Sequence, residues 1–480
     1  MFMRMIYDDK LAQAAYLIGC QMSGEAIVID PERDVDRYLR IAEQNGLKIV
    51  AVAETHIHAD FVSGARELAE RGAKAYVSAE GGPDWQSEWL DEKTGGGAYN
   101  AQRLRDGDTF SIGKIEFRVM HTPGHTPEHI VYLVTDRGGG ATEPMGMVTG
   151  DFVFVGDLGR PDLLETAAGH KGAMEPSARQ LFATVGKLST VSDYVQVWPA
   201  HGAGSACGKA LGAVPMSTIG YERRFNSAIR AATSEKNFVD FILSGQPEPP
   251  LYFANMKRVN KIGPRVLGEL PRPARIGATD LQKLDARKTA IVDTRAWGAY
   301  REGHIPGALS FPLTNAFNTD AGSMIAESEE IVLIIEPERL EEAVRDLIRV
   351  GLDRIVGWAA PADIAETAKA GGKLATLREI DVAAARPMVG DGRVRVLDVR
   401  RAAEFAEGAI AGATNIAHTR LLAELPRVPK GQPLLVHCRG GFRSARACAL
   451  LQRNGYEVIN LKGGFLAWDA AAASAPACSR

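Results

Sequence analysis

The residues ETHIHADF stand at positions 54–61, directly after the apolar run IVAVA at positions 49–53. A short apolar run that ends in polar residues predicts a buried strand. The imidazoles of His56 and His58 and the carboxylate of Asp60 then lie on the loop just past that strand. Because imidazole and carboxylate groups are common metal ligands, the sequence predicts a metal site at this loop.

Further candidate ligands follow other strand-like runs. His125 lies within HTPGHTPEH at positions 121–129, where two prolines and a glycine stiffen the loop. The other two histidines of this stretch are interpreted as loop and helix-start residues. Asp151 and His201 each follow an apolar run of their own. Candidate ligands past successive strand ends predict a layered α/β sandwich with one functional edge.

Local patterns predict the elements around these loops. Two apolar segments within 16–30, separated by Ser-Gly, predict a hairpin of buried strands. Helical spacing over 34–45 stops before a glycine, which is a common helix end. Alternating apolar residues over 112–119 predict one strand that leads into the second histidine loop.

The second half of the chain contains an internal repeat. DTR at 293–295 and GHIPGA at 303–308 recur as DVR at 398–400 and GAIAGA at 408–413, in the same register. Repetition over this length predicts two copies of one domain. In each copy, apolar runs that alternate with helical segments predict a parallel sheet with both faces covered.

The length of 480 residues predicts three domains, at about 150 residues each. A stretch at 263–276 with three prolines is the predicted linker. The predicted domains are therefore 1–263, 277–375 and 376–473.

Composition narrows the range of partners and compartments. The formal net charge is −3 and charged residues make up 24% of the chain, so neither nucleic acid nor a membrane surface is expected as a partner. No apolar run approaches the roughly 20 residues of a membrane span and the start lacks a signal-peptide pattern, so we expect a cytoplasmic protein. Five scattered cysteines indicate reduced thiols. The sequence is compatible with a homo-oligomer but does not fix the oligomeric state.

The four ligand-bearing segments, in this order, resemble the metallo-β-lactamase fold over roughly residues 1–263. The resemblance implies an N-terminal αββα sandwich. Phe61 takes the position at which the dinuclear zinc hydrolases of this fold have a histidine for a second metal. A phenyl ring offers no donor atom, which favours a single ion.

TGD at 149–151 followed by GRPD at 159–162 further resembles the persulfide dioxygenases, a branch related to glyoxalase II. This resemblance implies one mononuclear Fe(II) site whose ligands are His56, His125 and Asp151. It implies that Arg160 contacts the thiol carrier of the substrate. It also implies that His58, Asp60 and His201 lie near the metal and support its ligands. The implied reaction converts a low-molecular-weight thiol persulfide, O2 and water to the free thiol and sulfite.

A second chemical motif, HCRGGFRS at 437–444, lies between a predicted strand and a predicted helix. Cys438 in such a loop faces backbone N–H groups and a helix N-terminus, with Arg439 and Arg443 close by, and these groups stabilise an anionic sulfur. The motif resembles the active loop of rhodanese sulfurtransferases. The first repeat has EPER at 336–339 instead, and a carboxylate cannot carry sulfur, so that copy resembles an inactive rhodanese domain.

Together these resemblances predict a sulfide-detoxifying enzyme in which persulfide is oxidised to sulfite and Cys438 handles sulfane sulfur, forming thiosulfate. Cys207 is either an incidental small residue or, as in similar bacterial fusions of these domains, a participant in sulfur transfer. Two alternatives remain open: a dinuclear-zinc thioester hydrolase of glyoxalase II type, and a sulfur-relay protein with a silent metal domain. The sequence does not select glutathione, coenzyme A or another thiol as carrier.

Overall fold

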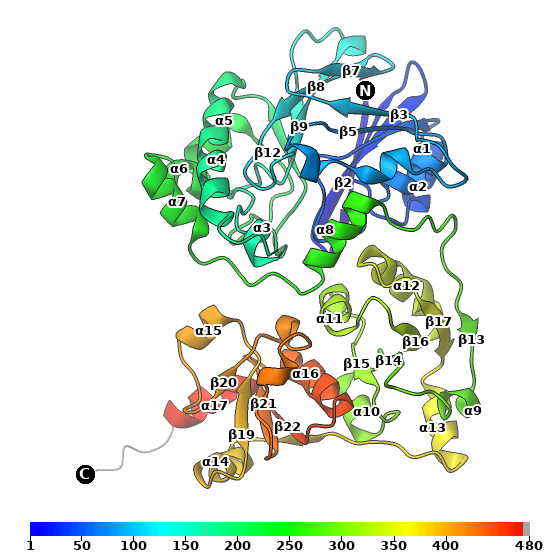
Figure 1. Cartoon of the computed structure of the whole chain (residues 1–480), viewed down its shortest axis with the longest axis vertical. Helices are drawn as coiled ribbons and strands as arrows, with labels where there is room; N and C mark the ends of the chain where they lie inside the picture. The colour runs from blue at the N-terminus through cyan, green and yellow to red at the C-terminus, as the bar shows by residue number, and fades with distance from the viewer. Residues whose placement is uncertain (168, 474–480) are drawn as a thin grey trace. The chain divides into compact units, whose positions relative to one another are not determined.

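The computed structural model of the chain describes residues 1–167 and 169–473, and Cys478 lies outside these ranges. The chain divides into two compact units, which are described separately (Figure 1). The first comprises Met1–Leu270 with Ile348–Gly351, and the second comprises Pro271–Leu347 with Leu352–Arg480.

The first unit contains two six-stranded sheets. The first sheet runs in the order β1 (Phe2–Asp8), β2 (Gln13–Cys20), β3 (Glu25–Ile29), β4 (Lys48–Ala53), β5 (Lys74–Ser78) and β6 (Ala101–Leu104). Strands β2 and β3 pair antiparallel, which confirms the predicted hairpin. From β3 to β6 the pairs are parallel.

The second sheet contains β7 (Thr109–Ile112), β8 (Ile115–His121), β9 (Ile130–Asp136), β10 (Gly146–Gly150), β11 (Gln196–Pro199) and β12 (Ser217–Thr218). The prediction of one strand over 112–119 is wrong, because β7 and β8 form an antiparallel hairpin in which Ile112 pairs with Ile115. The turn includes Gly113 at φ +54°, a backbone conformation that favours glycine.

Helices cover the outer faces of both sheets (Figure 1). They are α1 (Asp36–Gln44), α2 (Ala65–Glu70), α3 (Leu163–Thr166), α4 (Met174–Gly186), α5 (Ile219–Phe225), α6 (Ser227–Ala231), α7 (Glu235–Leu243) and α8 (Phe253–Ile262). One apolar cluster, with Tyr16, Phe117 and Trp198, joins the inner faces of the two sheets. Separate clusters join the first sheet to α1 and α2 and the second sheet to α4 and α7. This layering confirms the predicted αββα sandwich.

The second unit contains two five-stranded sheets of the same topology. One is β13 (Ala274–Arg275), β17 (Ile355–Ala359), β16 (Glu330–Ile334), β14 (Thr289–Asp293) and β15 (Leu309–Ser310). The other is β18 (Arg378–Ile380), β22 (Val458–Leu461), β21 (Leu434–His437), β19 (Arg395–Asp398) and β20 (Thr414–Asn415). All strand pairs in both sheets are parallel, as predicted.

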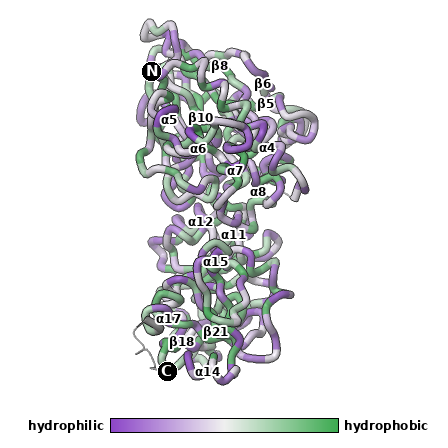
Figure 2. Tube along the Cα trace, turned by 90° about the vertical axis from the view of Figure 1, so that its left-hand side faces the viewer, coloured by the Kyte–Doolittle hydropathy of each residue, from purple (hydrophilic) through white to green (hydrophobic). Residues whose placement is uncertain are grey.

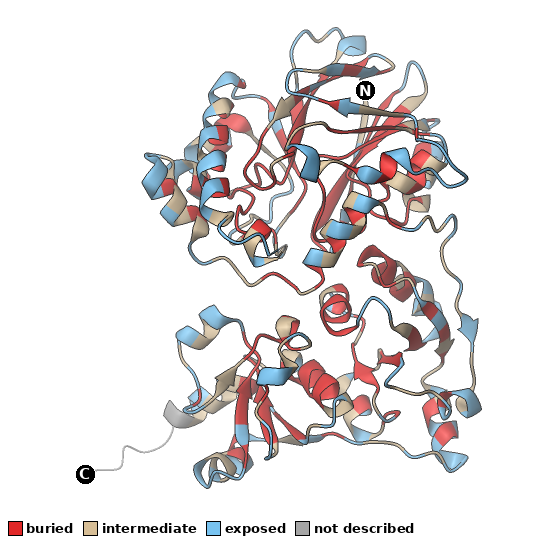
Figure 3. Ribbon diagram, in the orientation of Figure 1, coloured by how far each residue is buried: buried red, intermediate tan, exposed pale blue. Residues whose placement is uncertain are grey.

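The helices of the second unit are α9 (Ala278–Leu281), α10 (Trp297–Glu302), α11 (Phe317–Met324), α12 (Leu340–Arg349), α13 (Ala362–Lys369), α14 (Val382–Gly390), α15 (Ala402–Ala406), α16 (Phe442–Arg453) and α17 (Gly464–Ala473). Buried strands lie at the centre of each sheet and the outer helix faces are exposed (Figure 3). Hydrophobic and hydrophilic segments alternate along the trace (Figure 2).

Among the described residues, no helix has the length and apolar character needed to cross a bilayer.

The repeated Asp-x-Arg motif has the same structural role in both copies. In the first, Arg295 forms an ion pair with Asp293 and donates a hydrogen bond to the carbonyl of Gly303. In the second, Arg400 makes the corresponding contacts with Asp398 and Gly408. The arginine thus ties the end of a central strand to the loop eight residues further on, which explains why both halves of the motif recur together.

Candidate metal centre and cysteine loop

Three side chains from three loops converge at one edge of the sandwich. His56 follows β4, His125 lies between β8 and β9, and Asp151 follows β10. One donor atom of each lies within 4.8 Å of the other two, and all three residues are buried. The structure therefore brings together the ligand set named from the sequence.

Hydrogen bonds prepare both imidazoles to bind a cation. The Nδ1 atom of His125 lies 3.0 Å from the carbonyl oxygen of Arg160, which can only accept, so Nδ1 carries the proton and Nε2 keeps a lone pair. That Nε2 atom is 3.5 Å from Oδ2 of Asp151. The Nδ1 atom of His56 is held 2.9 Å from Oγ1 of Thr55. Neither carboxylate oxygen of Asp151 has a hydrogen-bond partner among the described residues, and a cation would satisfy both.

Burial shifts the pKa values of all three groups and keeps the two imidazoles in their neutral, ligating form. It lowers the pKa of His56 well below its usual value and lowers the pKa of His125 to about 3, so both rings are neutral near pH 7. It raises the pKa of Asp151 to about 6. Neutral imidazoles and a carboxylate with little solvation are the chemistry of a divalent cation site, and the donor set fits a metal ion.

The residue that holds the motif loop, Asp30, was not identified from the sequence. Its carboxylate accepts hydrogen bonds from the Thr55 backbone N–H at 2.7 Å and from the Thr55 hydroxyl at 2.9 Å. It also lies 3.1 Å from Nε2 of His58. Burial opposes a charge on His58, but the Asp30 carboxylate raises its pKa to about 9. The contact with Asp30 holds the His58 ring against the motif loop, and its buried Nδ1 atom has no hydrogen-bond partner among the described residues.

Asp30 itself adopts φ +52°, an unusual conformation for a residue with a side chain. In the sequence, Asp30 is marked only as a polar residue that ends a predicted strand and directly precedes a proline. Thr55 and His58, the partners of Asp30, come after the next helix and strand in the sequence, so they contact Asp30 only in the folded sheet.

Replacing Asp30 with alanine is expected to destabilise the protein by about 3 kcal/mol, because it leaves His58 and the Thr55 donors buried without their acceptor. Metal content per chain should fall in parallel. Urea unfolding and elemental analysis measure the two effects. Asp84→Ala, at an exposed position, is the control. A loss below about 0.5 kcal/mol, the range of ordinary surface substitutions, would contradict this role for Asp30.

Arg160 differs from its predicted role. Its Nε and Nη2 atoms donate to the two oxygens of Asp162 at 2.8 and 2.5 Å, and Nη1 donates to the carbonyl of Ala206 at 3.0 Å. The side chain is 1% exposed. The guanidinium fork that was expected to face a substrate anion therefore faces Asp162. Arg160 positions His125 through its backbone carbonyl instead.

Asp151 is positioned by two further residues. His129, interpreted from the sequence as a helix-start residue, directly precedes strand β9, and its Nε2 accepts a hydrogen bond of 3.0 Å from the backbone N–H of Asp151. At Gly159, an added Cβ would lie 1.8 Å from the carbonyl oxygen of Asp151. The glycine of the GRPD segment is thus required by a close backbone approach.

A second donor cluster lies beside the first. One atom each from Asp60, His201 and Cys207 lies within 4.8 Å of the other two. The Nε2 atom of His201 is 3.3 Å from Oδ2 of Asp60 and 3.4 Å from Oδ1 of Asp151. Burial, reinforced by the Asp60 and Asp151 carboxylates, raises the pKa of the Cys207 thiol well above its usual value. Without a cation, Cys207 is therefore a protonated thiol.

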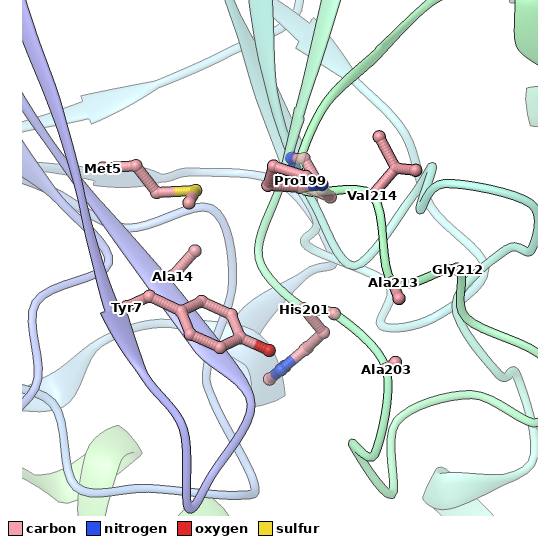
Figure 4. Close-up of a pocket in the computed structure, with 11 residues that line it drawn as sticks. Met5, Tyr7, Ala14, Pro199, His201, Ala203, Gly212, Ala213 and Val214 are labelled. Atoms are coloured by element: carbon pink, nitrogen blue, oxygen red, sulfur yellow. The ribbon is translucent and has the colours of Figure 1, made fainter.

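A pocket of about 370 Å³ reaches His201 from the surface (Figure 4). The imidazole of His201 and the phenol of Tyr7 lie at one side, and Val214 lies across from them (Figure 4). The lining is Met5, Tyr7, Ala14, Pro199, His201, Gly202, Ala203, Gly212, Ala213, Val214 and Pro215. Apart from the phenol of Tyr7 and the imidazole of His201, these side chains are small or apolar, so the pocket suits a small or weakly charged ligand.

The cysteine loop of the second rhodanese-like copy surrounds a buried sulfur. Cys438 follows β21, and its Sγ atom accepts hydrogen bonds from the Gly441 N–H at 3.1 Å and the Ser444 hydroxyl at 3.6 Å. Helix α16 begins one residue after Gly441. Arg443 is held by Glu404 in a two-point ion pair of 2.6 and 2.7 Å, whereas Arg439 is exposed. The loop therefore directs one N–H and one O–H donor at the sulfur, and such donors stabilise an anionic sulfur.

The first rhodanese-like copy contacts the helix that follows this loop. Asp320 on α11 forms a buried ion pair with Nε of Arg446 on α16 and lies 3.5 Å from Nε2 of His418. The pairing of β14 with β16 and of β19 with β21 places Ile335 of the first copy where the second has Cys438, and an isoleucine cannot carry sulfur. Its contribution to the second copy is thus structural support for α16.

Replacing Asp320 with asparagine is expected to destabilise the second unit by about 3 kcal/mol, since Arg446 would keep a buried charge without its partner. If the Cys438 loop has the sulfurtransferase activity that the sequence resemblance implies, that activity should fall with the loss of the ordered α16 start. Chemical unfolding and a thiosulfate assay measure both. Glu366→Gln, which removes an exposed ion pair with Lys369, should change stability by less than about 0.5 kcal/mol. Equal stability of the two variants would refute the supporting role.

Comparison with known proteins agrees with this architecture. A model of the metallo-beta-lactamase superfamily matches residues 8–201, and a model of the rhodanese-like domain matches 278–355 and 381–471. A beta-lactamase hydrolase-like protein of Agrobacterium fabrum is 29% identical over 254 residues, covering 48% of this chain and 53% of the relative. This chain thus spans about half the length of that relative.

Two further relatives are informative. The persulfide dioxygenase ETHE1, mitochondrial, of Bos taurus is 24% identical over 237 residues, covering 48% of this chain and 78% of the relative. The crystal structure of a metallo-beta-lactamase from Staphylococcus aureus subsp. aureus COL is 40% identical, covers 75% of this chain and 99% of that chain, and superposes with a TM-score of 0.66. The chain therefore belongs to the metallo-β-lactamase superfamily, with two rhodanese-like domains following its metal-binding sandwich.

Proposed function

We propose that this protein is an iron-dependent persulfide dioxygenase coupled to a sulfurtransferase. In this proposal one Fe(II) ion is held by His56, His125 and Asp151, and Cys438 carries sulfane sulfur. The observation that carries the proposal is the convergence of two neutral imidazoles and one unpartnered carboxylate in a buried site. Two histidines and one carboxylate with open positions are typical of non-haem Fe(II) oxygenases. The likeness to a protein named persulfide dioxygenase points to the same chemistry.

The proposed reaction is R–S–SH + O2 + H2O → R–SH + SO3²⁻ + 2 H⁺. When bound, Fe(II) supplies the electron-transfer chemistry by which dioxygen reacts with a sulfur nucleophile. The chain's own residues fix the geometry: Arg160 orients His125 through its carbonyl, Thr55 contacts His56, and His129 holds the backbone of Asp151. Burial of this site keeps bulk water away from a reactive persulfide.

The proposed transfer step takes place at Cys438. Its thiolate attacks the outer sulfur of a second persulfide, the S–S bond breaks, and the carrier thiol leaves. Sulfite then attacks the sulfur carried by Cys438, giving thiosulfate and regenerating the thiolate. The Gly441 N–H and the Ser444 hydroxyl stabilise the anionic sulfur before and after transfer. Having both activities on one chain raises the effective concentration of sulfite near Cys438.

The proposed substrates are therefore a low-molecular-weight thiol persulfide and O2, and the products are sulfite and thiosulfate. Most side chains that line the pocket beside His201 are small or apolar. Such a lining favours a persulfide whose sulfur end is uncharged or slender, and it disfavours a bulky anion at this position.

A zinc thioester hydrolase of glyoxalase II type is the second candidate, because the Asp60, His201 and Cys207 cluster offers donors for another ion. Metal exchange distinguishes the two functions. The metal-free protein is loaded anaerobically with Fe(II) or Zn(II) and assayed for oxygen uptake with glutathione persulfide and for hydrolysis of a glutathione thioester. The proposal expects oxygen uptake only with iron. Thioester hydrolysis by the zinc form, with no oxygen uptake by the iron form, would overturn it.

A further inference from the structure

A carboxylate neutralises one of the two arginines of the Cys438 loop. Arg443 lies in the first turn of α16, directly before Ser444, whose hydroxyl contacts the sulfur. The Nη1 and Nη2 atoms of Arg443 donate to the two carboxylate oxygens of Glu404, at 2.6 and 2.7 Å. Glu404 lies on α15, so a separate helix supplies the negative charge.

Arg443 interacts with the sulfur as well as with Glu404. Burial acts to lower the pKa of the Arg443 guanidinium, but the Glu404 carboxylate and then the Cys438 thiol outweigh it and raise this pKa above its ordinary value. The side chains of Arg443 and Glu404 are only 25% and 26% exposed. Water and salt therefore screen this ion pair less than they screen a pair on the open surface.

The ion pair changes what an anion meets on its way to Cys438. A guanidinium with a free fork binds an oxyanion through two parallel N–H donors. In Arg443 both of these donors face Glu404, whose own charge repels a second anion. Arg439 is exposed, so its attraction for an anion is weakened by solvent.

We propose that Glu404 makes the Cys438 loop selective among sulfur donors, so that it accepts sulfur from a persulfide in preference to thiosulfate. The inference rests on the proposed function, because it requires Cys438 to carry sulfane sulfur. Thiosulfate is a dianion that would need the fork of Arg443, whereas a persulfide presents a sulfur end with less charge. Glu404 acts through Arg443 and is therefore a positioning residue.

Both donors would give the same form of the loop. The Cys438 thiolate attacks the outer sulfur of either donor, and the S–S bond of the donor breaks. The bonding electron pair leaves with sulfite in one case and with the carrier thiolate in the other, and Cys438 keeps one sulfane sulfur. Transfer from thiosulfate is the reverse of the proposed thiosulfate-forming step. Weak binding of thiosulfate therefore lets this product leave the loop instead of occupying it.

Steady-state sulfur transfer to cyanide by the full-length protein tests the inference. The donors are thiosulfate and the persulfide of mercaptoethanol, whose carrier is uncharged, and the rate with Cys438→Ser is subtracted as background. Glu404→Gln should lower KM for thiosulfate by at least about 10-fold at similar kcat, because the fork of Arg443 becomes available. KM for the persulfide should change by less than about 2-fold, since this donor does not use the fork.

Glu407→Gln is the matched control, because it removes the same charge from an exposed position directly after α15. It should keep the wild-type KM for both donors. In an Arg443→Gln background, adding Glu404→Gln should not change KM for thiosulfate further, because the group through which Glu404 acts is absent.

An unchanged KM for thiosulfate in Glu404→Gln would overturn the inference. Equal changes with both donors would also overturn it, because they indicate a loosened loop and not a change in selectivity. If Glu404→Gln does not fold by circular dichroism, Glu404→Asp replaces it and should lower KM for thiosulfate by at least about 3-fold, since the shorter side chain holds the fork less well. A wild type no faster than Cys438→Ser with either donor would instead refute the proposed role of Cys438, and the inference with it.

Discussion

Replacing His125 with alanine will lower iron-dependent oxygen uptake with a thiol persulfide by at least about 100-fold. The substitution removes one of two imidazoles in the first site and leaves Oδ2 of Asp151 without its neighbour at 3.5 Å. The iron content of the purified protein should fall with the activity. An oxygen electrode and elemental analysis on the same samples measure both quantities.

The control for this variant is His170→Ala, which changes an exposed histidine of the same unit. It should keep wild-type iron content and oxygen uptake. If His125→Ala consumes oxygen at the wild-type rate, the metal domain is silent and the sulfur-relay alternative gains support.

Replacing Cys438 with serine will lower thiosulfate formation by at least about 1,000-fold while oxygen uptake stays at the wild-type level. Serine keeps the shape of the loop and the donors from Gly441 and Ser444, but its oxygen cannot carry sulfane sulfur as cysteine does. Sulfite should therefore accumulate. Chromatographic quantification of sulfite and thiosulfate over time measures this change.

Cys448→Ala provides the comparison, at a cysteine in the helix that follows the Cys438 loop. Cys448 is buried in α16, and burial raises its thiol pKa well above the usual value, so it is not expected to act as a nucleophile. This variant should form thiosulfate normally. Unchanged thiosulfate formation by Cys438→Ser would place the transfer step at another group.

The fold was largely accessible from the sequence because its signals are local. The hairpin of β2 and β3 and the two parallel sheets follow from apolar periodicity, turn residues and the repeated Asp-x-Arg motif, whereas the αββα sandwich was implied by the family resemblance of the ligand-bearing segments. The one strand predicted over 112–119 failed because alternating apolar residues continue across a two-residue turn, and only the backbone conformation of Gly113 reveals it.

The sequence predicted the candidate ligands that follow strand ends. It did not predict the contacts between residues that are distant in the sequence. Asp30 reaches Thr55 and His58 only because β3 and β4 are neighbours in one sheet. His129 reaches Asp151 through the pairing of β9 and β10.

Cys207 shows a further limit of motif-based reasoning about the metal. The expectation of a single ion rested on Phe61, which offers no donor within the motif. The folded chain brings another donor, the Cys207 sulfur, beside Asp60 and His201 from outside it. Arg160 is the opposite case. Its ion-pair partner, Asp162, is only two residues away in the sequence, so this pairing could have been predicted from the sequence.

The stoichiometry of oxygen and sulfite tests the central claim most directly. Full-length Cys438→Ser protein, loaded to a series of Fe(II) contents, is supplied with glutathione persulfide while O2 consumption and sulfite release are recorded together. The account predicts one O2 consumed per sulfite formed, at a rate proportional to the iron content. Sulfite release that is independent of iron, or persulfide loss without oxygen consumption, would contradict it.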